Sequence, residues 1–231
     1  IRPEMLECAA DGAPLAEILT GAAANLGDRL VRKDGSVLTV TIGLHGSLAH
    51  NSDRASGNDV IDGGDGDDDL VGGGGDGAGG GDVIRGGDGD DAVIGSEAFD
   101  RIYGGDGDDV SSAGDGADVF LGGAGADIGF GEAGQDRLLG GLGEDALYGD
   151  DGADKLFGDA GDDVLWGGAG GDVMRGGNGD DELYGGGQRD RLFGGEGDDA
   201  LNGGGSRDSV FGGAGDDVID GGAGPDLLVG G

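Results

Sequence analysis

A nine-residue period is the feature that most constrains the fold of this chain. The frame Gly-Gly-x-Gly-x-Asp-x-U-x, in which U is a large apolar residue, runs from Gly86 to Val229 without a slip, for 16 repeats. Three more frames precede it, at residues 54–62, 63–71 and 77–85, and an insertion at 72–76 separates the last two. One apolar residue in nine cannot build a core within one repeat, so the period predicts that about 19 repeats stack on one another.

Position eight of the frame holds the residue that would form this core. It is apolar in 17 of the 19 repeats, and the exceptions are Ser111 and Gly129. The Val, Ile, Leu and Phe found there favour short strands, with position eight pointing inward and positions seven and nine outward. Glycines at positions one, two and four permit positive φ and a close approach of neighbouring backbones. The frame therefore predicts an all-β solenoid in which turns on the same side lie about 4.8 Å apart.

Position six is aspartate in all 19 repeats. A single Asp beside Gly is only a turn signal, but 19 in one phase call for a further reason. Carboxylates about 4.8 Å apart repel one another by roughly 1 kcal/mol in bulk water, and by more in a partly desolvated turn. These residues are Asp59, Asp68, Asp82, Asp91, Asp100, Asp109, Asp118, Asp127, Asp136, Asp145, Asp154, Asp163, Asp172, Asp181, Asp190, Asp199, Asp208, Asp217 and Asp226.

The charge of the chain indicates which ligands to expect. The 49 acidic and 13 basic residues give a net charge of −36, and with 64 glycines such a composition is typical of disorder in the absence of a cation. Residues 54–231 carry −33 of this charge. So negative a surface should repel nucleic acid and anionic lipid and attract cations. The single cysteine, Cys8, excludes an internal disulfide and any multi-cysteine zinc site, and no stretch is apolar enough for a transmembrane segment.

The frames at 54–231 resemble the RTX, or hemolysin-type, calcium-binding nonapeptide repeats of secreted bacterial proteins. The resemblance implies a parallel β-roll (a β-helix or solenoid) in which GGxGxD forms a turn and xUx a strand. Alternate repeats would stack on opposite sides. It also implies a secreted, extracellular protein that leaves a bacterium by type I secretion.

Calcium ions between the turns are the cofactor that the resemblance implies. Each ion would take oxygens from positions two, four and six of one repeat and from positions one, three and six of the second repeat along. Only the aspartates would use their side chains, and Ca²⁺ accepts six to eight such oxygens whereas Mg²⁺ demands a tighter octahedron. Nineteen repeats paired in this way allow at most about 17 ions, which nearly cancels the net charge. One such site would consist of Gly195, Gly197 and Asp199 with Gly212, Ala214 and Asp217.

Several repeats depart from the frame. Between residues 95 and 139 the departures are Ser96, Ala98, Ser111, Ala113 and Gly129, and further along Gln188 and Ser206 replace the fourth glycine. We expect the region 95–139, together with the insertion, to open first as calcium is withdrawn.

Position nine carries several aromatic residues. Phe130, Tyr148, Trp166 and Tyr184 occur in alternate repeats, so they would form four successive rungs on one face. Two interpretations remain: a ladder that packs on itself and stiffens the sheet, or a stripe that binds a partner domain or a sugar.

Residues 1–53 lie outside the repeats and form a separate flanking segment. The stretch 14–26 is compatible with a short helix, and 28–42 indicates a hairpin around Asp34-Gly35, so we expect a small cap on the first coil. His45 and His50 are accompanied by no HExxH, GxSxG or paired-carboxylate motif, and we interpret them as loop residues.

The sequence thus predicts a non-catalytic, monomeric calcium-binding module that is disordered without calcium and folds on binding it outside the cell. An upstream domain would be attached in the full-length parent. The alternatives are the C-terminal part of a secreted enzyme or toxin (protease, lipase, epimerase or hemolysin), or part of a surface adhesin. An upstream catalytic motif would indicate an enzyme, and many further repeats an adhesin.

Overall fold

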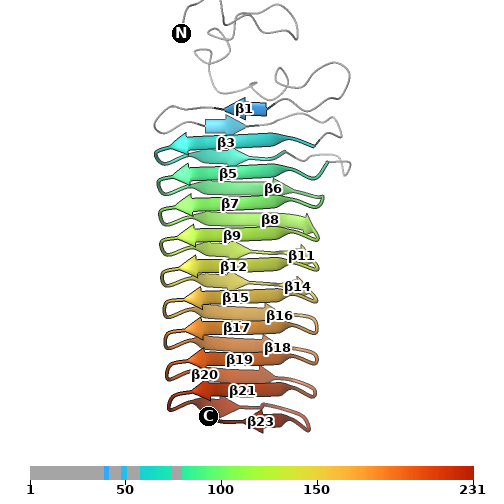
Figure 1. Cartoon of the computed structure of the whole chain (residues 1–231). Helices are drawn as coiled ribbons and strands as arrows, with labels where there is room; N and C mark the ends of the chain where they lie inside the picture. Colours follow the sequence, from blue (N-terminus) through green and yellow to red (C-terminus); the bar gives the residue numbers. More distant parts are fainter. Residues whose placement is uncertain (1–38, 42–47, 51–57, 74–79) are drawn as a thin grey trace, which may run out of the picture.

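Two parallel β-sheets face each other along the length of the chain, and the backbone alternates between them (Figure 1). The computed structural model describes residues 39–41, 48–50, 58–73 and 80–231. Each of the 19 repeats contributes one strand, so the predicted all-β parallel β-roll is confirmed. No helix in the described part of the chain is long and apolar enough to cross a membrane.

The first sheet takes its strands from every second repeat. Its order is β1 (Thr39–Thr41), β3 (Val60–Asp65), β5 (Val83–Asp88), β7 (Arg101–Asp106), β9 (Val119–Ala124), β12 (Arg137–Leu142), β15 (Lys155–Ala160), β17 (Val173–Asn178), β19 (Arg191–Glu196), β21 (Ser209–Ala214) and β23 (Leu227–Val229).

The second sheet takes the strands between them. Its order is β2 (Leu48–His50), β4 (Asp69–Val71), β6 (Ala92–Ser96), β8 (Val110–Gly116), β10 (Ile128–Phe130), β13 (Ala146–Tyr148), β16 (Val164–Gly168), β18 (Glu182–Gly186), β20 (Ala200–Gly204) and β22 (Val218–Asp220). Two short strands in the turns, β11 (Ala133–Gly134) and β14 (Asp151–Gly152), pair beside it.

Paired residues on neighbouring strands of a sheet are separated by one full coil, which consists of two repeats. Leu192 of β19 pairs with Val210 of β21, eighteen residues later. Across the insertion the partners are instead 23 residues apart, as in the pair Ile61 and Ile84. The ladder therefore absorbs the five extra residues without losing its phase.

Two strands upstream of the repeats continue the ladders. β1 pairs in parallel with β3, and β2 pairs in parallel with β4. The ladder therefore begins before the boundary placed at residue 53, inside the second half of the stretch predicted as a hairpin. His50 ends strand β2, so its interpretation as a loop residue is wrong. The predicted helix at 14–26, the rest of the hairpin, Cys8, His45 and the side chain of His50 lie outside the described residues.

Position-eight side chains meet between the sheets and form one continuous core. They are at most 4 % exposed from Ile61 to Val210. Burying each large apolar side chain stabilises the fold by about 1.5–3 kcal/mol. At the last rungs Ile219 is only partly buried and Leu228 is 47 % exposed.

The two polar or small residues at core positions have different outcomes. A Cβ atom at Gly129 would lie 2.5 Å from the ring of Phe120, so this ring from the opposite sheet occupies the space that a side chain would fill. At Ser111 the hydroxyl is buried with no hydrogen-bond partner among the described residues. Only Ser111 therefore remains a defect of the core, because an unpaired buried hydroxyl costs free energy.

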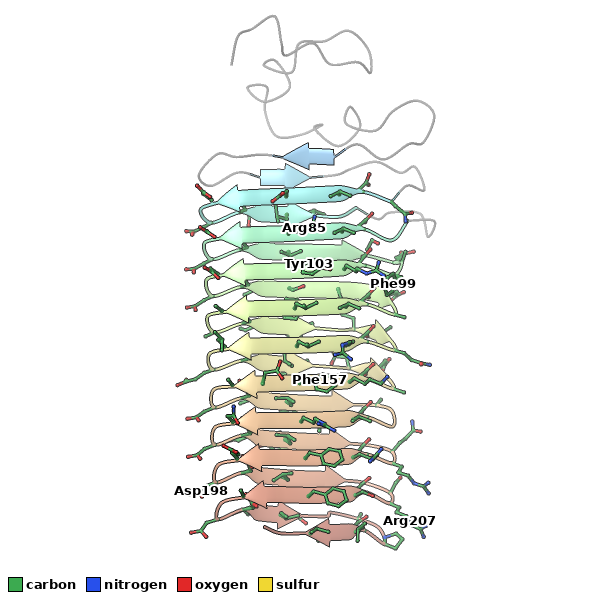
Figure 2. All side chains as sticks on the ribbon, in the orientation of Figure 1. Arg85, Phe99, Tyr103, Phe157, Asp198 and Arg207 are labelled. Carbon is green, nitrogen blue, oxygen red and sulfur yellow. The ribbon has the colours of Figure 1, made fainter. Side chains whose placement is uncertain are left out.

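The outer faces of the sheets differ in charge. The first sheet carries six exposed basic side chains, some of which pack over rings, as Arg85 does 5.4 Å from the ring centroid of Tyr103 (Figure 2). The strands of the second sheet contain no Lys or Arg. The basic residues of the first sheet are Arg85, Arg101, Arg137, Lys155, Arg175 and Arg191.

The predicted aromatic residues do occupy successive rungs of the second sheet. Phe130 stacks on Tyr148 with ring centroids 4.9 Å apart, and Trp166 stacks on Tyr184 at 4.2 Å. These contacts support the self-packing interpretation, since each ring buries surface against its neighbour.

Candidate metal sites

A hydrogen-bonded ladder of aspartates runs along each edge of the roll. The backbone N–H of a position-six Asp donates to Oδ1 of the Asp in the second repeat along, as Asp181 does to Asp199 at 2.9 Å. Seventeen such bonds of 2.7–3.2 Å join the 19 aspartates, from Asp59 to Asp226. The structure thus brings together each pair of aspartates that the frame predicted to share an ion.

The second carboxylate oxygen of most of these aspartates is buried with no hydrogen-bond partner among the described residues. A buried carboxylate oxygen without a partner is costly, and a cation is the usual compensation. The oxygens concerned are Oδ2 of Asp91, Asp109, Asp118, Asp127, Asp136, Asp145, Asp154, Asp163, Asp172, Asp181, Asp190, Asp199, Asp208 and Asp217.

Burial shapes the ionisation of these groups. It raises the pKa of Asp163 to about 7, although the backbone hydrogen bond from Asp145 acts in the opposite direction. Burial likewise raises the pKa of Asp190 to about 7 on the other edge. Without a cation, the fold therefore disfavours the charged form of both carboxyls near neutral pH.

The turn at 194–199 shows what surrounds such an oxygen. A Cβ atom built on Gly194 would lie 2.2 Å from Oδ2 of Asp199 and 2.5 Å from the carbonyl oxygen of Gly212 in the next turn. Position one of this turn therefore has room only for glycine, because a side chain there would displace the carboxylate oxygen, the carbonyl oxygen or both.

Further carbonyl oxygens of this turn face the next turn on the same edge. A Cβ on Gly213 would lie 2.1 Å from the Gly195 oxygen, and one on Gly215 would lie 1.9 Å from the Gly197 oxygen. The carbonyl of Ala214 accepts a hydrogen bond of 2.8 Å from the Gly197 N–H, which leaves it one lone pair.

Oxygen is the only donor type available between the turns. Within the described part of the chain, no three His, Cys, Asp or Glu side chains come together as a metal site. Each gap between turns instead offers two aspartates and several backbone carbonyls. Such a donor set suits Ca²⁺, which accepts carbonyl and carboxylate oxygen in flexible geometry.

The two edges of the roll are chemically different, which the nine-residue frame did not reveal. We call the edge formed by the turns after first-sheet strands the acidic edge, because position five there is acidic in eight of nine turns. These residues are Asp67, Asp90, Asp108, Glu144, Asp162, Asp180, Asp198 and Asp216. Six carboxylates of this kind accept the position-five N–H of the next turn, as Asp198 does from Asp216 at 2.7 Å.

The opposite edge, which we call the mixed edge, follows the second-sheet strands. Its described turns from residue 95 onward have no acid at position five, and two have arginine, Arg189 and Arg207. Asp198 and Arg207 lie on opposite edges in Figure 2. The signal was present in the sequence, but only at a period of eighteen.

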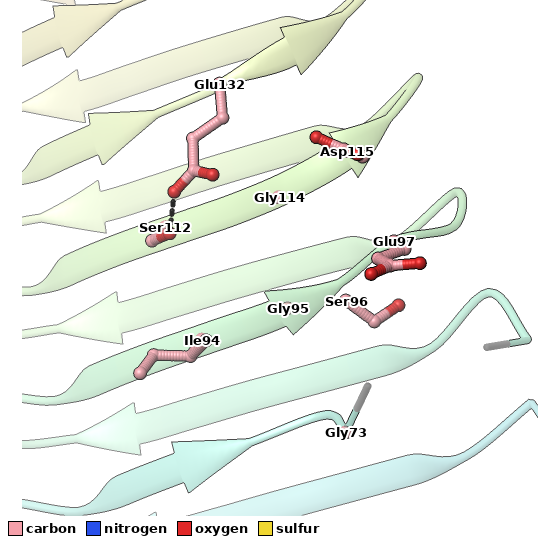
Figure 3. Close-up of a pocket in the computed structure, with 9 residues that line it drawn as sticks. All are labelled: Gly73, Ile94, Gly95, Ser96, Glu97, Ser112, Gly114, Asp115 and Glu132. Atoms are coloured by element: carbon pink, nitrogen blue, oxygen red, sulfur yellow. Dashed lines mark hydrogen bonds between the residues drawn. The ribbon is translucent and has the colours of Figure 1, made fainter. Parts of the chain in front are cut away.

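A hollow of about 410 Å³ lies beside the mixed edge, at its turn 95–100 (Figure 3). Three carboxylates line it, from Glu97, Asp115 and Glu132, and Ser112 donates a hydrogen bond to the last of these. It is an open surface feature and does not enclose the aspartate ladder.

Comparison with known families agrees with this geometry. The chain matches the family described as RTX calcium-binding nonapeptide repeat (4 copies), over 55–77, 76–102, 85–120, 103–138, 130–165, 139–174, 166–201 and 193–228. Among curated proteins, none matches the chain. The matched residues span about three quarters of the sequence and coincide with the coils that carry the aspartate ladders. The chain therefore belongs to the RTX calcium-binding nonapeptide repeat family, and Ca²⁺ is its ligand.

Proposed function

We propose that residues 54–231 are a calcium-dependent folding module whose ions bind between successive turns of each edge. The observation that carries this proposal is the row of buried Oδ2 oxygens without a hydrogen-bond partner in the described chain. A divalent cation neutralises two such carboxylates at once, and no side chain of the repeats offers a substitute in the regular turns.

Each ion is held by one repeat and the second repeat along. In the example above, Asp199 supplies a carboxylate and Gly195 and Gly197 supply carbonyl oxygens. The next turn adds its position-six aspartate and the carbonyls of Gly212 and Ala214. The remaining position-six aspartates act in the same way, each shared between the gaps before and after it.

Removing the ions leaves stacked carboxylates that repel one another. The repulsion is about 1 kcal/mol for each pair in water and larger in a desolvated turn, and it recurs at every coil. Each bound ion stabilises the folded state by RT ln(1 + [L]/Kd), or about 2.7 kcal/mol at a hundred times Kd. The metal-free chain is therefore disordered, and the loaded chain is a roll.

This dependence suits a secreted protein. Extracellular calcium modules bind at about 10⁻⁴–10⁻³ M, so the chain stays unfolded inside the bacterium, passes a type I secretion system and folds outside. Membership of a calcium-binding repeat family favours a structural rather than a catalytic role, in support of an upstream domain of the parent. The net charge of −36 favours a monomer by self-repulsion.

Circular dichroism during a calcium titration of the chelator-treated chain tests the proposal. The β signal should appear cooperatively with Ca²⁺ and should not appear with Mg²⁺ at equal ionic strength. A β signal already complete in chelator would contradict it.

A further inference from the structure

In turn 95–100, the buried carboxylate of the position-six aspartate has hydrogen-bond partners of its own. Oδ2 of Asp100 accepts hydrogen bonds from the backbone N–H of Ser96 at 2.6 Å and from its hydroxyl at 2.9 Å. The equivalent oxygen of 14 other position-six aspartates, from Asp91 to Asp217, has no hydrogen-bond partner among the described residues. The Ser96 hydroxyl also accepts from the N–H of Ala98 at 3.3 Å, which fixes its orientation.

The backbone of this turn has changed to allow these bonds. Among the described turns, Ser96 is the one position-two residue without a positive φ. All the remaining position-two residues have a positive φ, from +64° at Asp150 to +143° at Gly195. Its N–H therefore points in a different direction from that of the other position-two residues.

The oxygen that Ser96 binds is the one that would face an ion. A Cβ on Gly95 would lie 2.8 Å from Oδ2 of Asp100 and 2.2 Å from the carbonyl oxygen of Ala113. The equivalent pair of oxygens lies against Gly194 in the regular turn. The departures Ser96 and Ala98 thus both belong to this single gap, whereas the buried Cβ of Ala113 belongs to the next gap along, between turns 113–118 and 131–136.

We infer that the gap between turns 95–100 and 113–118 binds no calcium and is closed instead by Ser96. This inference rests on the proposed calcium module, and it makes the ion column of the mixed edge discontinuous at this point. The loaded chain then holds at least one ion fewer than the 17 that its pairs of repeats would allow. One rung of the roll is thereby independent of calcium.

Ion counting by native mass spectrometry at saturating calcium tests the inference. Ser96→Gly removes the hydroxyl and restores the residue of the regular turns, so it should bind one ion more than the parent chain. Ser206→Gly is the matched control, because this serine lies on the same edge and its hydroxyl contacts the carbonyl of Gly187 rather than a carboxylate. The control should bind the same number as the parent. Equal counts for Ser96→Gly and the parent would overturn the inference.

A second pair of variants keeps the inference testable if Ser96→Gly does not fold. Asp118 borders the closed gap on one side, so Asp118→Asn should lose at most one ion. Asp154, on the same edge, borders two gaps whose turns keep glycine at positions one and four, so Asp154→Asn should lose two. Equal losses would overturn the inference, whereas a parent chain that binds no ions would overturn the calcium module itself.

Discussion

The acidic and mixed edges of the roll have the same aspartate ladder, yet they differ in everything around it. Every turn of the acidic edge that the structure describes keeps glycine at positions one and four, and most add a second, exposed carboxylate at position five. On the mixed edge those positions include Ala98, Ala113, Gln188 and Ser206, and position five is neutral or basic. A chain that is uniformly acidic in composition is therefore strongly polarised across its width.

The difference shows that buried and exposed acids have separate roles. Position-six aspartates occur on both edges and lie between the turns, where we propose that they bind the ions. Position-five acids occur on one edge only and lie in solvent, where they increase the local negative potential. We therefore expect the acidic edge to load calcium before the mixed edge.

Lowering the pH should have the largest effect on the stability of the metal-free roll, because it protonates buried aspartates on both edges alike. The folded chain holds Asp163 and Asp190 with pKa values of about 7, against an ordinary value of 3.8 in the unfolded chain. The metal-free roll therefore takes up protons between about pH 7 and pH 4, and its stability rises as the pH falls through that window. Circular dichroism in chelator should show more β structure at pH 5 than at pH 8. A metal-free chain equally disordered at both values would contradict this.

The next largest effect should come from removing one buried aspartate on each edge. Asp181→Ala on the acidic edge and Asp190→Ala on the mixed edge each break one N–H bond and empty two gaps. Both should raise the calcium midpoint of folding several-fold. Asp181→Ala should raise it more, since the exposed carboxylates of Asp180 and Asp198 strengthen the sites lost there. Equal midpoints for the two variants would show that the edges bind calcium alike.

A single methyl group provides a smaller and more local test. Gly194→Ala places a Cβ against Oδ2 of Asp199 and the carbonyl oxygen of Gly212, so it should displace these oxygens and cost about one ion per chain. Gly187→Ala on the mixed edge is the control, because its Cβ would have 3.8 Å to the nearest atom. Calcium counting should separate the two variants. If Gly194→Ala keeps the full count, the oxygens beside position one are not part of the site.

The smallest effect should come from the exposed charges. Asp198→Asn should weaken calcium binding by about twofold or less, and only at low ionic strength, because salt screens exposed charges. Arg189→Gln should act in the opposite direction, since it removes a positive charge that repels Ca²⁺ at the mixed edge. Titrations at two salt concentrations would measure both. A change that persists at high salt would place Asp198 among the direct ligands.

Most of the fold could be predicted from the sequence because two side-chain positions determine it. Buried residues at position eight and aspartates at position six repeat in one phase, so stacking followed from the spacing, whereas the pairing of alternate repeats was implied by the resemblance to the RTX repeats. The contrast between the edges was missed, because it appears only when alternate repeats are compared.

Two local features could not be predicted from the frame. Gly129 is compensated by Phe120 from the opposite sheet, and contacts between sheets depend on side-chain conformation rather than on spacing. From the sequence, Ser96 was only a departure that should weaken its turn. Its hydrogen bonds to Asp100 require that Ser96 lack the positive φ of the other position-two residues, and the frame gives no information on this angle. We therefore refine the prediction that residues 95–139 open first. The Ser111 hydroxyl, unpaired in the described chain, favours opening of this region, whereas the hydrogen bonds of Ser96 should hold its own turn closed.

Because the chain alternates between two sheets, the structural unit is a pair of repeats rather than a single one. Gain or loss of nine residues would keep the position-six aspartates in phase, but it would transfer every later turn to the opposite edge and place the position-five acids where the arginines stand. Gain or loss of eighteen would leave the pattern intact, and the five extra residues at 72–76 are tolerated because the ladder resumes in phase after them. A gene for a roll of this kind should therefore gain or lose repeats in pairs, so that the protein lengthens or shortens by whole coils.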